Sequence, residues 1–203
     1  MTDQIKKLFN ERLGRYQAAI ALEPTDRIPI STTLTAFLAK NSGYTHQQIM
    51  YYDPQLLIQA GIDFVKENPE LDTLQPLFQW APSWEVVNRR YYRIPGRDIS
   101  PNSLHQFVEA EYMKENEYRM LIDDPVGYRI NYYFPRVFGE FKERGSIRSY
   151  MAFLKAGLVS GVFKAMSREG SERLAREAGM PAAFRGMFVA PFDYLADFYR
   201  GLQ

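Results

Sequence analysis

Short apolar runs alternate with helical patterns along this chain, and this alternation limits what it can fold into more than any other feature. β-Branched and apolar residues fill positions 28–32 and 71–78, and a helical pattern precedes each run. Parallel strands need a crossover of a dozen or more residues, which is usually a helix. The alternation therefore predicts an α/β fold with a parallel sheet. Only three or four strands can be counted, which would leave an edge of the sheet open.

Helix boundaries are marked by capping signals. Apolar positions predict a first helix over 3–22, Thr45 and Gln48 fit a capping box, and Asp53-Pro54 and Asp124-Pro125 fit helix starts. The longest helical pattern covers 147–168, and we expect a separate short helix from Ser171 to Gly179. Residues 84–92 are typical of a third strand or of one arm of a hairpin.

Composition excludes several classes of site. The 203 residues include no cysteine and two histidines, so a disulfide, a thiolate ligand or a Cys/His zinc site cannot be built from this chain alone. No His/Cys/Asp set has metal-ligand spacing. Charges are balanced, at 25 Lys+Arg against 24 Asp+Glu, so nothing favours a nucleic acid or a membrane surface as partner. The N-terminus does not resemble a signal peptide and no apolar run approaches ~20 residues, so we expect a cytoplasmic protein.

Residues 180–201 form the most suggestive stretch for ligand binding. They are typical of an apolar strand, a turn at Ala190-Pro191 and a helix, an arrangement in which α/β proteins often bind ligands. Asp193 and Asp197 lie four residues apart and would share a helix face, and Arg200 follows. Asp193 is equally explained by the helix dipole, which favours a negative charge in the first turn. Asp197 lies in an apolar context that this explanation does not cover.

A second candidate site lies at His105, Gln106 and Glu109. An imidazole beside carboxylates can serve proton transfer, and in a helix His105 and Glu109 would share a face. The alternative is a surface turn with solvated acids. The fourteen tyrosines leave a similar choice between an aromatic pocket and ordinary core and rim positions.

Four stretches together resemble the uroporphyrinogen decarboxylase-like superfamily, which includes haem-pathway decarboxylases and cobalamin-dependent methyltransferases. They are residues 15–30, 95–113, 117–125 and 181–201. The resemblance implies a (β/α)8 TIM-barrel type of fold, preceded by N-terminal helices and often dimeric. Such proteins usually run well past this length, and a barrel of this kind needs ~250 residues. We therefore expect residues 1–203 to form one incomplete domain, about the first half of a barrel, truncated at the C-terminus.

The resemblance favours methyl transfer with a corrinoid carrier as the parent activity. The decarboxylases carry arginines after the first strand, where this chain has the run 31–37 without one, and they place a tyrosine where this chain has Asp197. A porphyrinogen decarboxylase is therefore the second hypothesis. A non-catalytic half-barrel completed by a partner chain is the third. Zinc and a corrinoid are implied as cofactors only for a longer parent protein, because the methyltransferase zinc ligands belong to the second half of the barrel.

By the resemblance, the candidate residues line the cavity at the carboxyl ends of the strands. Asp197 is the expected catalytic contact to substrate, and Arg200 would bind an anionic group. The remaining expected substrate contacts are His105, Gln106, Glu109 and Asp193. The expected substrate is a small molecule or a corrinoid protein.

Overall fold

The computed structural model describes residues 1–34, 36–76, 80–143 and 145–181. These residues form a mixed α/β structure that is mostly helical, with a few short strands and no closed barrel. The mixed α/β class predicted from the alternation is confirmed. Within the described ranges, no helix combines the length and the apolar character needed to cross a bilayer.

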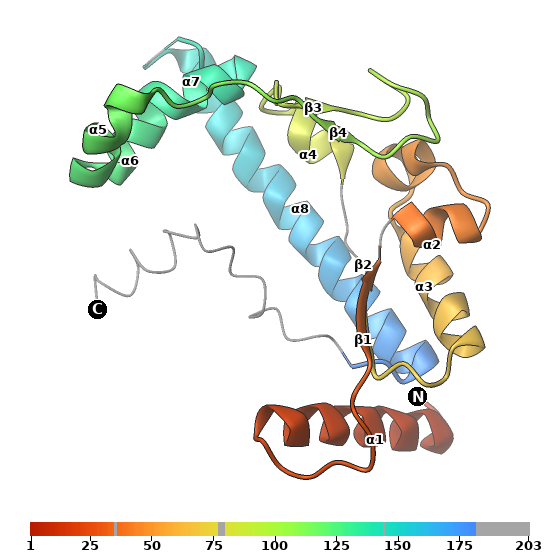
Figure 1. Cartoon of the computed structure of the whole chain (residues 1–203). Helices are drawn as coiled ribbons and strands as arrows, with labels where there is room; N and C mark the ends of the chain where they lie inside the picture. The colour runs from red at the N-terminus through yellow and green to blue at the C-terminus, as the bar shows by residue number, and fades with distance from the viewer. Residues whose placement is uncertain (35, 77–79, 144, 182–203) are drawn as a thin grey trace.

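A β–α–β unit lies at the centre of the structure (Figure 1). Strand β1 (Ser31–Leu34) pairs in parallel with β2 (Thr73–Pro76), in a register that aligns Ser31 with Thr73 and Leu34 with Pro76. The connection carries α2 (Ala36–Asn41), the π-helical turn η1 (Gln48–Tyr52) and α3 (Gln55–Glu67). The predicted parallel pairing is confirmed. The first strand begins later than expected, so that Pro29 precedes it and takes no ladder bond.

The main core of the described residues lies between this unit and their last helix. Helix α8 (Ile147–Ala178) packs against α3. The buried cluster between them consists of Ile58, Ile62, Val65, Leu71, Leu74, Leu174, Ala178 and Met180. Met180 is 1% exposed. The chain therefore leaves α8 on the side of the helix that faces the sheet.

Buried charges join the first helix to the amino ends of the two strands. Helix α1 (Asp3–Ile20) carries Arg12, which is 2% exposed. Its guanidinium donates to the carbonyl oxygens of Ala178 at 2.7 Å and Gly179 at 3.2 Å, at the end of α8, and to that of Pro69 at 3.1 Å. A cation suits this position because the carbonyls at a helix C-terminus are unpaired and carry partial negative charge.

Asp72, directly before β2, is the acceptor at the centre of the same region. It is fully buried and accepts from the guanidinium groups of Arg15 and Arg27, the latter at 2.6 and 2.9 Å. It also accepts from the backbone amide of Ile30 at 2.9 Å, directly before β1. One carboxylate thus links the starts of both strands to α1.

Beyond β2 the chain forms a helical turn and a short hairpin. Helix α4 (Ala81–Glu85) is followed by β3 (Tyr92–Arg93), which pairs antiparallel with β4 (Gln106–Phe107). The prediction of a strand over 84–92 is therefore wrong for most of its length, and the hairpin alternative is confirmed only at its end. Pro82 at the start of α4 and the positive φ of Asn88, 50°, explain why an extended run does not form.

The segment from 115 to 141 is a series of short helical turns. These are η2 (Glu115–Glu117), α5 (Tyr118–Asp123), α6 (Pro125–Tyr128), η3 (Arg129–Tyr133), α7 (Phe134–Val137) and η4 (Gly139–Phe141). The predicted cap at Asp124 is confirmed, since its carboxylate accepts from the amide of Gly127 at 2.9 Å. Glu117 holds the turns together through a bidentate pair with Arg136, at 2.6 and 2.7 Å.

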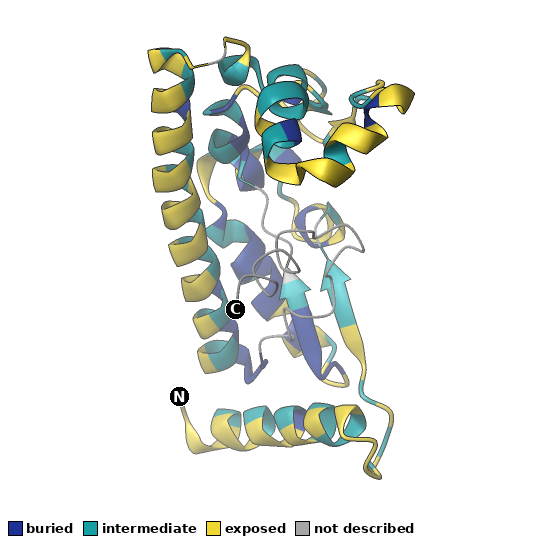
Figure 2. Cartoon of the chain, turned by 90° about the vertical axis from the view of Figure 1, so that its left-hand side faces the viewer, coloured by how far each residue is buried: buried dark blue, intermediate teal, exposed yellow. Residues whose placement is uncertain are grey.

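Helix α8 is one continuous helix where two were predicted. Ser171 does not cap a new helix; its hydroxyl donates to the carbonyl of Ser167, 3.0 Å away within α8. The helix begins at a Ser146 cap and ends as predicted at Gly179, whose φ of 59° is left-handed. Figure 2 shows that much of the outer side of this helix is exposed.

Candidate functional site

A cavity of about 440 Å³ opens beside the carboxyl end of β1. Ala36, which begins α2 just after β1, contributes to its wall. The other lining residues come from α2, from the loop between α2 and η1, and from the loop that precedes β4: Lys40, Gly43, Tyr44, His46, Asn102 and Leu104. A volume of this size is typical of small-molecule sites. We call this space the histidine cavity.

The loop that carries His46 is held by a confirmed capping box. The amide of Gln48 donates to the Thr45 hydroxyl at 3.1 Å, and the Gln48 side chain accepts from the Thr45 amide at 2.8 Å. A backbone bond of 3.1 Å from the amide of Gln47 to the carbonyl of Pro101 joins the loop to the opposite wall. Gly96 completes the fit, because a Cβ at this residue would lie 2.0 Å from the Gln47 side chain.

His46 is the buried polar group of the cavity. His46 is 8% exposed, and neither of its ring nitrogens has a hydrogen-bond partner among the described residues. Burial lowers the pKa of His46, so the imidazole is neutral at pH 7. An unsatisfied buried donor or acceptor costs about 1–3 kcal/mol. A polar ligand group that reached this ring would recover part of that free energy.

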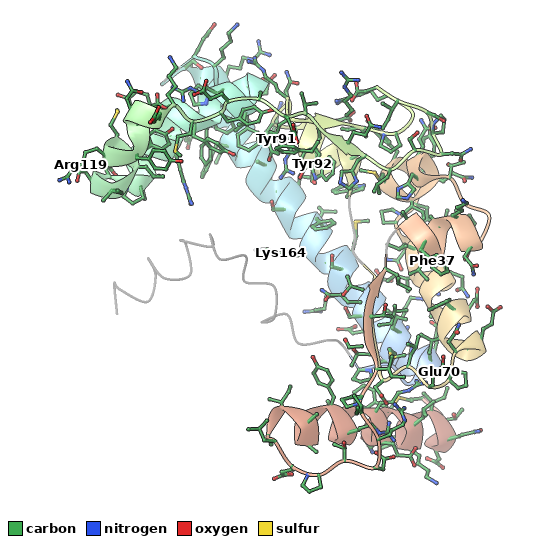
Figure 3. All side chains as sticks on the ribbon, in the orientation of Figure 1. Phe37, Glu70, Tyr91, Tyr92, Arg119 and Lys164 are labelled. Atoms are coloured by element: carbon green, nitrogen blue, oxygen red, sulfur yellow. The ribbon has the colours of Figure 1, made fainter. Side chains whose placement is uncertain are left out.

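His105 lies next to the same region, against the hairpin. Its ring packs edge-on against Trp84 and Tyr92, with centroid separations of 5.3 and 5.4 Å. Burial lowers the pKa of His105, and the proximity of His46 lowers it further. The aromatic side chains labelled Tyr91 and Tyr92 in Figure 3 come from this hairpin. Arg89 lies over the Trp84 ring, 5.2 Å from its centroid, so a cation already occupies that aromatic face.

Three polar groups accompany the imidazole in the histidine cavity. Lys40 supplies an ammonium group, Tyr44 a phenol and Asn102 an amide. Together they offer one positive charge and several neutral donors and acceptors. This set can bind a small polar or singly anionic molecule, and the neutral His46 can exchange a proton with it.

The predicted site residues are distributed unequally around this cavity. His105 adjoins it, while Gln106 is exposed in β4 opposite Arg93 and Glu109 is exposed beyond the strand. His105 and Glu109 would share a face only in a helix, and this condition is not met, because Gln106 and Phe107 form a hairpin strand that pairs with Arg93 and Tyr92. Asp193, Asp197 and Arg200 lie outside the described residues.

Sequence reasoning did not single out His46, Lys40, Tyr44 or Asn102. The scarcity of histidine was the one available signal, since His46 is one of two in the chain. The capping box of Thr45 and Gln48, which flank His46, correctly predicted a helix start, but it does not predict the direction of the His46 side chain. In the described ranges, no group of three or more His, Cys, Asp or Glu side chains could hold a metal ion.

No family model, curated protein or solved structure matches this chain.

Proposed function

We propose that this chain forms the first units of a uroporphyrinogen decarboxylase-like (β/α)8 barrel whose ligands bind at the carboxyl ends of the strands. The observation that carries the proposal is the histidine cavity beside the end of β1, since barrels of this type bind ligands on that face. The parallel β1–α3–β2 unit and the helix α1 across the amino ends of the strands also support it. Buried charge at the opposite end, around Asp72, suits the face that serves stability.

Methyl transfer involving a corrinoid carrier is the activity that we propose for this barrel. A decarboxylase acting on a porphyrinogen needs several cations for its many carboxylates. Arg12, Arg15 and Arg27 all lie at the amino ends of the strands, bound to carbonyls and carboxylates. Lys40 is the cation that lines the histidine cavity. A single positive charge suits a small substrate better than a polycarboxylate.

The residues of this chain do not form a site for zinc, the metal that the methyltransferase branch uses. The chain has no cysteine, and the described part offers no cluster of three metal ligands. What the residues of the cavity can do is hold a small polar substrate: Lys40 and Asn102 orient it, and His46 accepts or donates one hydrogen bond. Asp197 and Arg200 remain predicted contacts.

A binding titration with two probes tests the proposal. Cobalamin and a porphyrin octacarboxylate are titrated separately into the chain, and tryptophan fluorescence is followed because Trp84 lies beside His105. We expect saturable binding of cobalamin, with the porphyrin at least ~10-fold weaker, a difference of about 1.4 kcal/mol. Cobalamin is larger than the histidine cavity and would have to lie across its opening, where Lys40 is exposed. Lys40→Ala should therefore weaken cobalamin binding several-fold, while Lys7→Ala on α1 serves as the matched control.

Each outcome decides between the alternatives. Stronger binding of the porphyrin would favour the decarboxylase. Binding that Lys40→Ala leaves unchanged would place the corrinoid away from the histidine cavity. Absence of binding by either probe would contradict both activities.

A further inference from the structure

The histidine cavity contains a buried polar side chain that the described part of the fold leaves without a partner. His46 lines this cavity, and both of its ring nitrogens lack a hydrogen bond to any described residue. A neutral imidazole has one N–H donor and one acceptor nitrogen, so two groups lack a partner. Almost all buried polar groups in native proteins are hydrogen-bonded. A ligand in the cavity would supply the missing bonds.

The loop that carries His46 uses its other polar groups within the fold. Thr45 and Gln48 bond to each other in the capping box, at 2.8 and 3.1 Å. The amide of Gln47 donates to the carbonyl of Pro101 at 3.1 Å. These bonds fix the position of the loop without reaching the imidazole. Its two nitrogens therefore remain available to a bound molecule.

The charge around the imidazole favours an anion. Lys40 lines the cavity, and no carboxylate of the described residues lies within ion-pair distance of its ammonium group. The other described lining residues include no Asp or Glu: Ala36, Gly43, Tyr44, His46, Asn102 and Leu104. One ammonium group balances one negative charge. A monoanion therefore suits the cavity better than a cation, a phosphate dianion or a polycarboxylate.

The rest of the wall suits an apolar body. Ala36 and Leu104 contribute aliphatic side chains, and Tyr44 contributes an aromatic ring. The volume of about 440 Å³ leaves room for more than a carboxylate group alone. Asn102 adds an amide that can donate to a carboxylate oxygen. The lining therefore matches a molecule with one anionic end and an apolar remainder.

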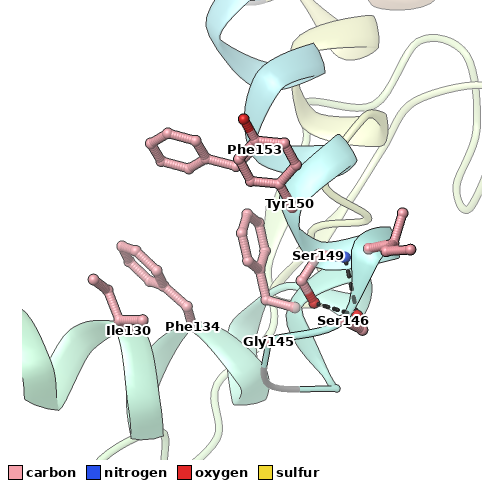
Figure 4. A pocket seen from close by; sticks show the side chains of 9 residues that line it. Ile130, Phe134, Gly145, Ser146, Ser149, Tyr150 and Phe153 are labelled. Carbon is pink, nitrogen blue, oxygen red and sulfur yellow. Dashed lines mark hydrogen bonds between the residues drawn. The ribbon is translucent and has the colours of Figure 1, made fainter.

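A groove at the start of α8 lacks these polar features (Figure 4). Its volume is about 500 Å³, and Phe134 of α7 and Tyr150 and Phe153 of α8 line it. The hydroxyls of Ser146 and Ser149 bond to each other at 3.1 Å. The described lining residues of this groove carry no charge. The groove, which we call the α8 groove, therefore serves as a comparison site for an apolar probe.

We propose that the histidine cavity binds a small monocarboxylate with an apolar body, and that His46 takes up one proton from solvent when the carboxylate enters. In the complex, the carboxylate oxygens accept hydrogen bonds from the Lys40 ammonium, the Asn102 amide and the protonated imidazole. No covalent bond of the ligand forms or breaks. The inference rests on the use of the histidine cavity in the proposed function, and it names the class of substrate held there.

The uptake of a proton follows from the surroundings of the imidazole. In the free cavity, burial lowers the pKa of His46 and keeps the ring neutral at pH 7. A carboxylate beside the buried ring favours its charged form. Lys40 on α2 and His105 before β4 oppose the added charge, and Tyr44 contributes a neutral phenol. Affinity should therefore rise as the pH falls from 8 to 6, a range in which a carboxylate stays ionised.

Calorimetric titration of the whole chain with benzoate tests the proposal. We expect saturable binding, with a dissociation constant that falls at least ~5-fold from pH 8 to pH 6. At pH 7 the binding enthalpy should change with the ionisation enthalpy of the buffer, which measures the proton taken up. Benzamide has the same ring without the charge and should bind at least ~10-fold more weakly. Benzylammonium should bind more weakly still, because its charge repels that of Lys40.

Three variants locate the site. Lys40→Ala should raise the dissociation constant of benzoate at least ~5-fold, and because Lys40 is exposed the fold should tolerate the change, which circular dichroism verifies. His46→Gln keeps a polar side chain that cannot be protonated, so the proton uptake and the pH dependence should disappear. Phe153→Ala in the α8 groove is the control and should leave benzoate binding unchanged.

The results separate this inference from the proposed function. If benzoate does not bind at pH 6, or binds no better than benzamide, the monocarboxylate is refuted, while binding of cobalamin would still support methyl transfer. If benzoate binds and cobalamin does not, the monocarboxylate stands and methyl transfer is refuted. Binding that Phe153→Ala weakens and Lys40→Ala does not would place the probe in the α8 groove and overturn the inference. Binding without proton uptake would refute the role of His46.

Discussion

Replacement of Asp72 by asparagine should destabilise this protein, because Asp72 is the fully buried acceptor of two arginines. Asp72→Asn keeps the size of the side chain and an acceptor for the Ile30 amide. It removes the negative charge that Arg15 and Arg27 share. Removing one partner of a buried pair typically costs 3–5 kcal/mol.

The exposure of the two arginines reduces this figure. The Arg15 side chain is 14% exposed and that of Arg27 is 37% exposed, so water can partly hydrate the guanidinium groups that lose their partner. We therefore expect a loss of about 2–3 kcal/mol in the free energy of unfolding. For a chain of this length, that corresponds to a fall of roughly 5–10 °C in melting temperature.

Urea denaturation at pH 7, followed by circular dichroism, measures the effect. Asp26→Asn is the matched control, because Asp26 pairs with the same Arg15 but its side chain is 66% exposed. That variant should move the midpoint far less. In a double-mutant cycle, Arg27→Met should cost less in the Asp72→Asn background than in the wild type. An Asp72→Asn variant within about 0.5 kcal/mol of wild type would refute the reasoning, as would an equal effect of Asp26→Asn.

Three further predictions concern other parts of the structure. Hydrogen bonds from Arg136 lower the pKa of Glu117 from 4.5 to about 2, so the stability that Glu117 contributes above pH 4.5 is lost as the pH falls towards 2. The free energies of unfolding of wild type and Glu117→Gln should therefore converge as the pH is lowered. A constant difference between the two proteins across this pH range would contradict the prediction. The pKa of His46 is lowered from 6.5, so stability should decrease as the pH falls below 6.5, and His46→Gln should reduce that slope to the part that His105 contributes. Proton NMR titration of the imidazole checks the shift directly, and an ordinary midpoint would disprove it. Gly179→Ala should lose more stability than Gly145→Ala, by about 1 kcal/mol or more in thermal unfolding, since both have positive φ but a Cβ on Gly179 would lie 3.0 Å from the Ile5 carbonyl oxygen and one on Gly145 meets nothing. Equal losses would show that contact with α1 adds nothing.

Local signals predicted the helix ends well because a cap is a local interaction. The box at Thr45 and Gln48, the cap at Asp124 and the left-handed Gly179 all depend on groups within a few residues of one another. The start of a separate helix at Ser171 was mispredicted because this position depends on more than its sequence neighbours. Its hydroxyl could equally bond backward within a helix, and packing of Leu174 and Ala178 against α3 favours the continuous form.

The candidate site is formed by contacts between residues that are distant in the sequence, and sequence reasoning identified only His105, which adjoins the cavity. His105 was singled out, yet its neighbours Trp84 and Tyr92 come from α4 and β3. His46 lies in the cavity because the amide of Gln47 bonds to Pro101, more than fifty residues away. No local pattern specifies that meeting of two loops.

The amino-acid sequence by itself determined the alternation of helix and strand, the parallel pairing that this alternation requires, and the exclusion of cysteine chemistry. These properties depend on periodicity and composition, which are local or additive. Only the tertiary structure decided that Asp72 receives three donor groups, that His46 is buried beside a cavity, and that the apolar side of α8 at Leu158 faces outward. The sequence of a helix with apolar residues on two opposite faces does not predict which face is buried in the fold, because that depends on where the remaining elements pack.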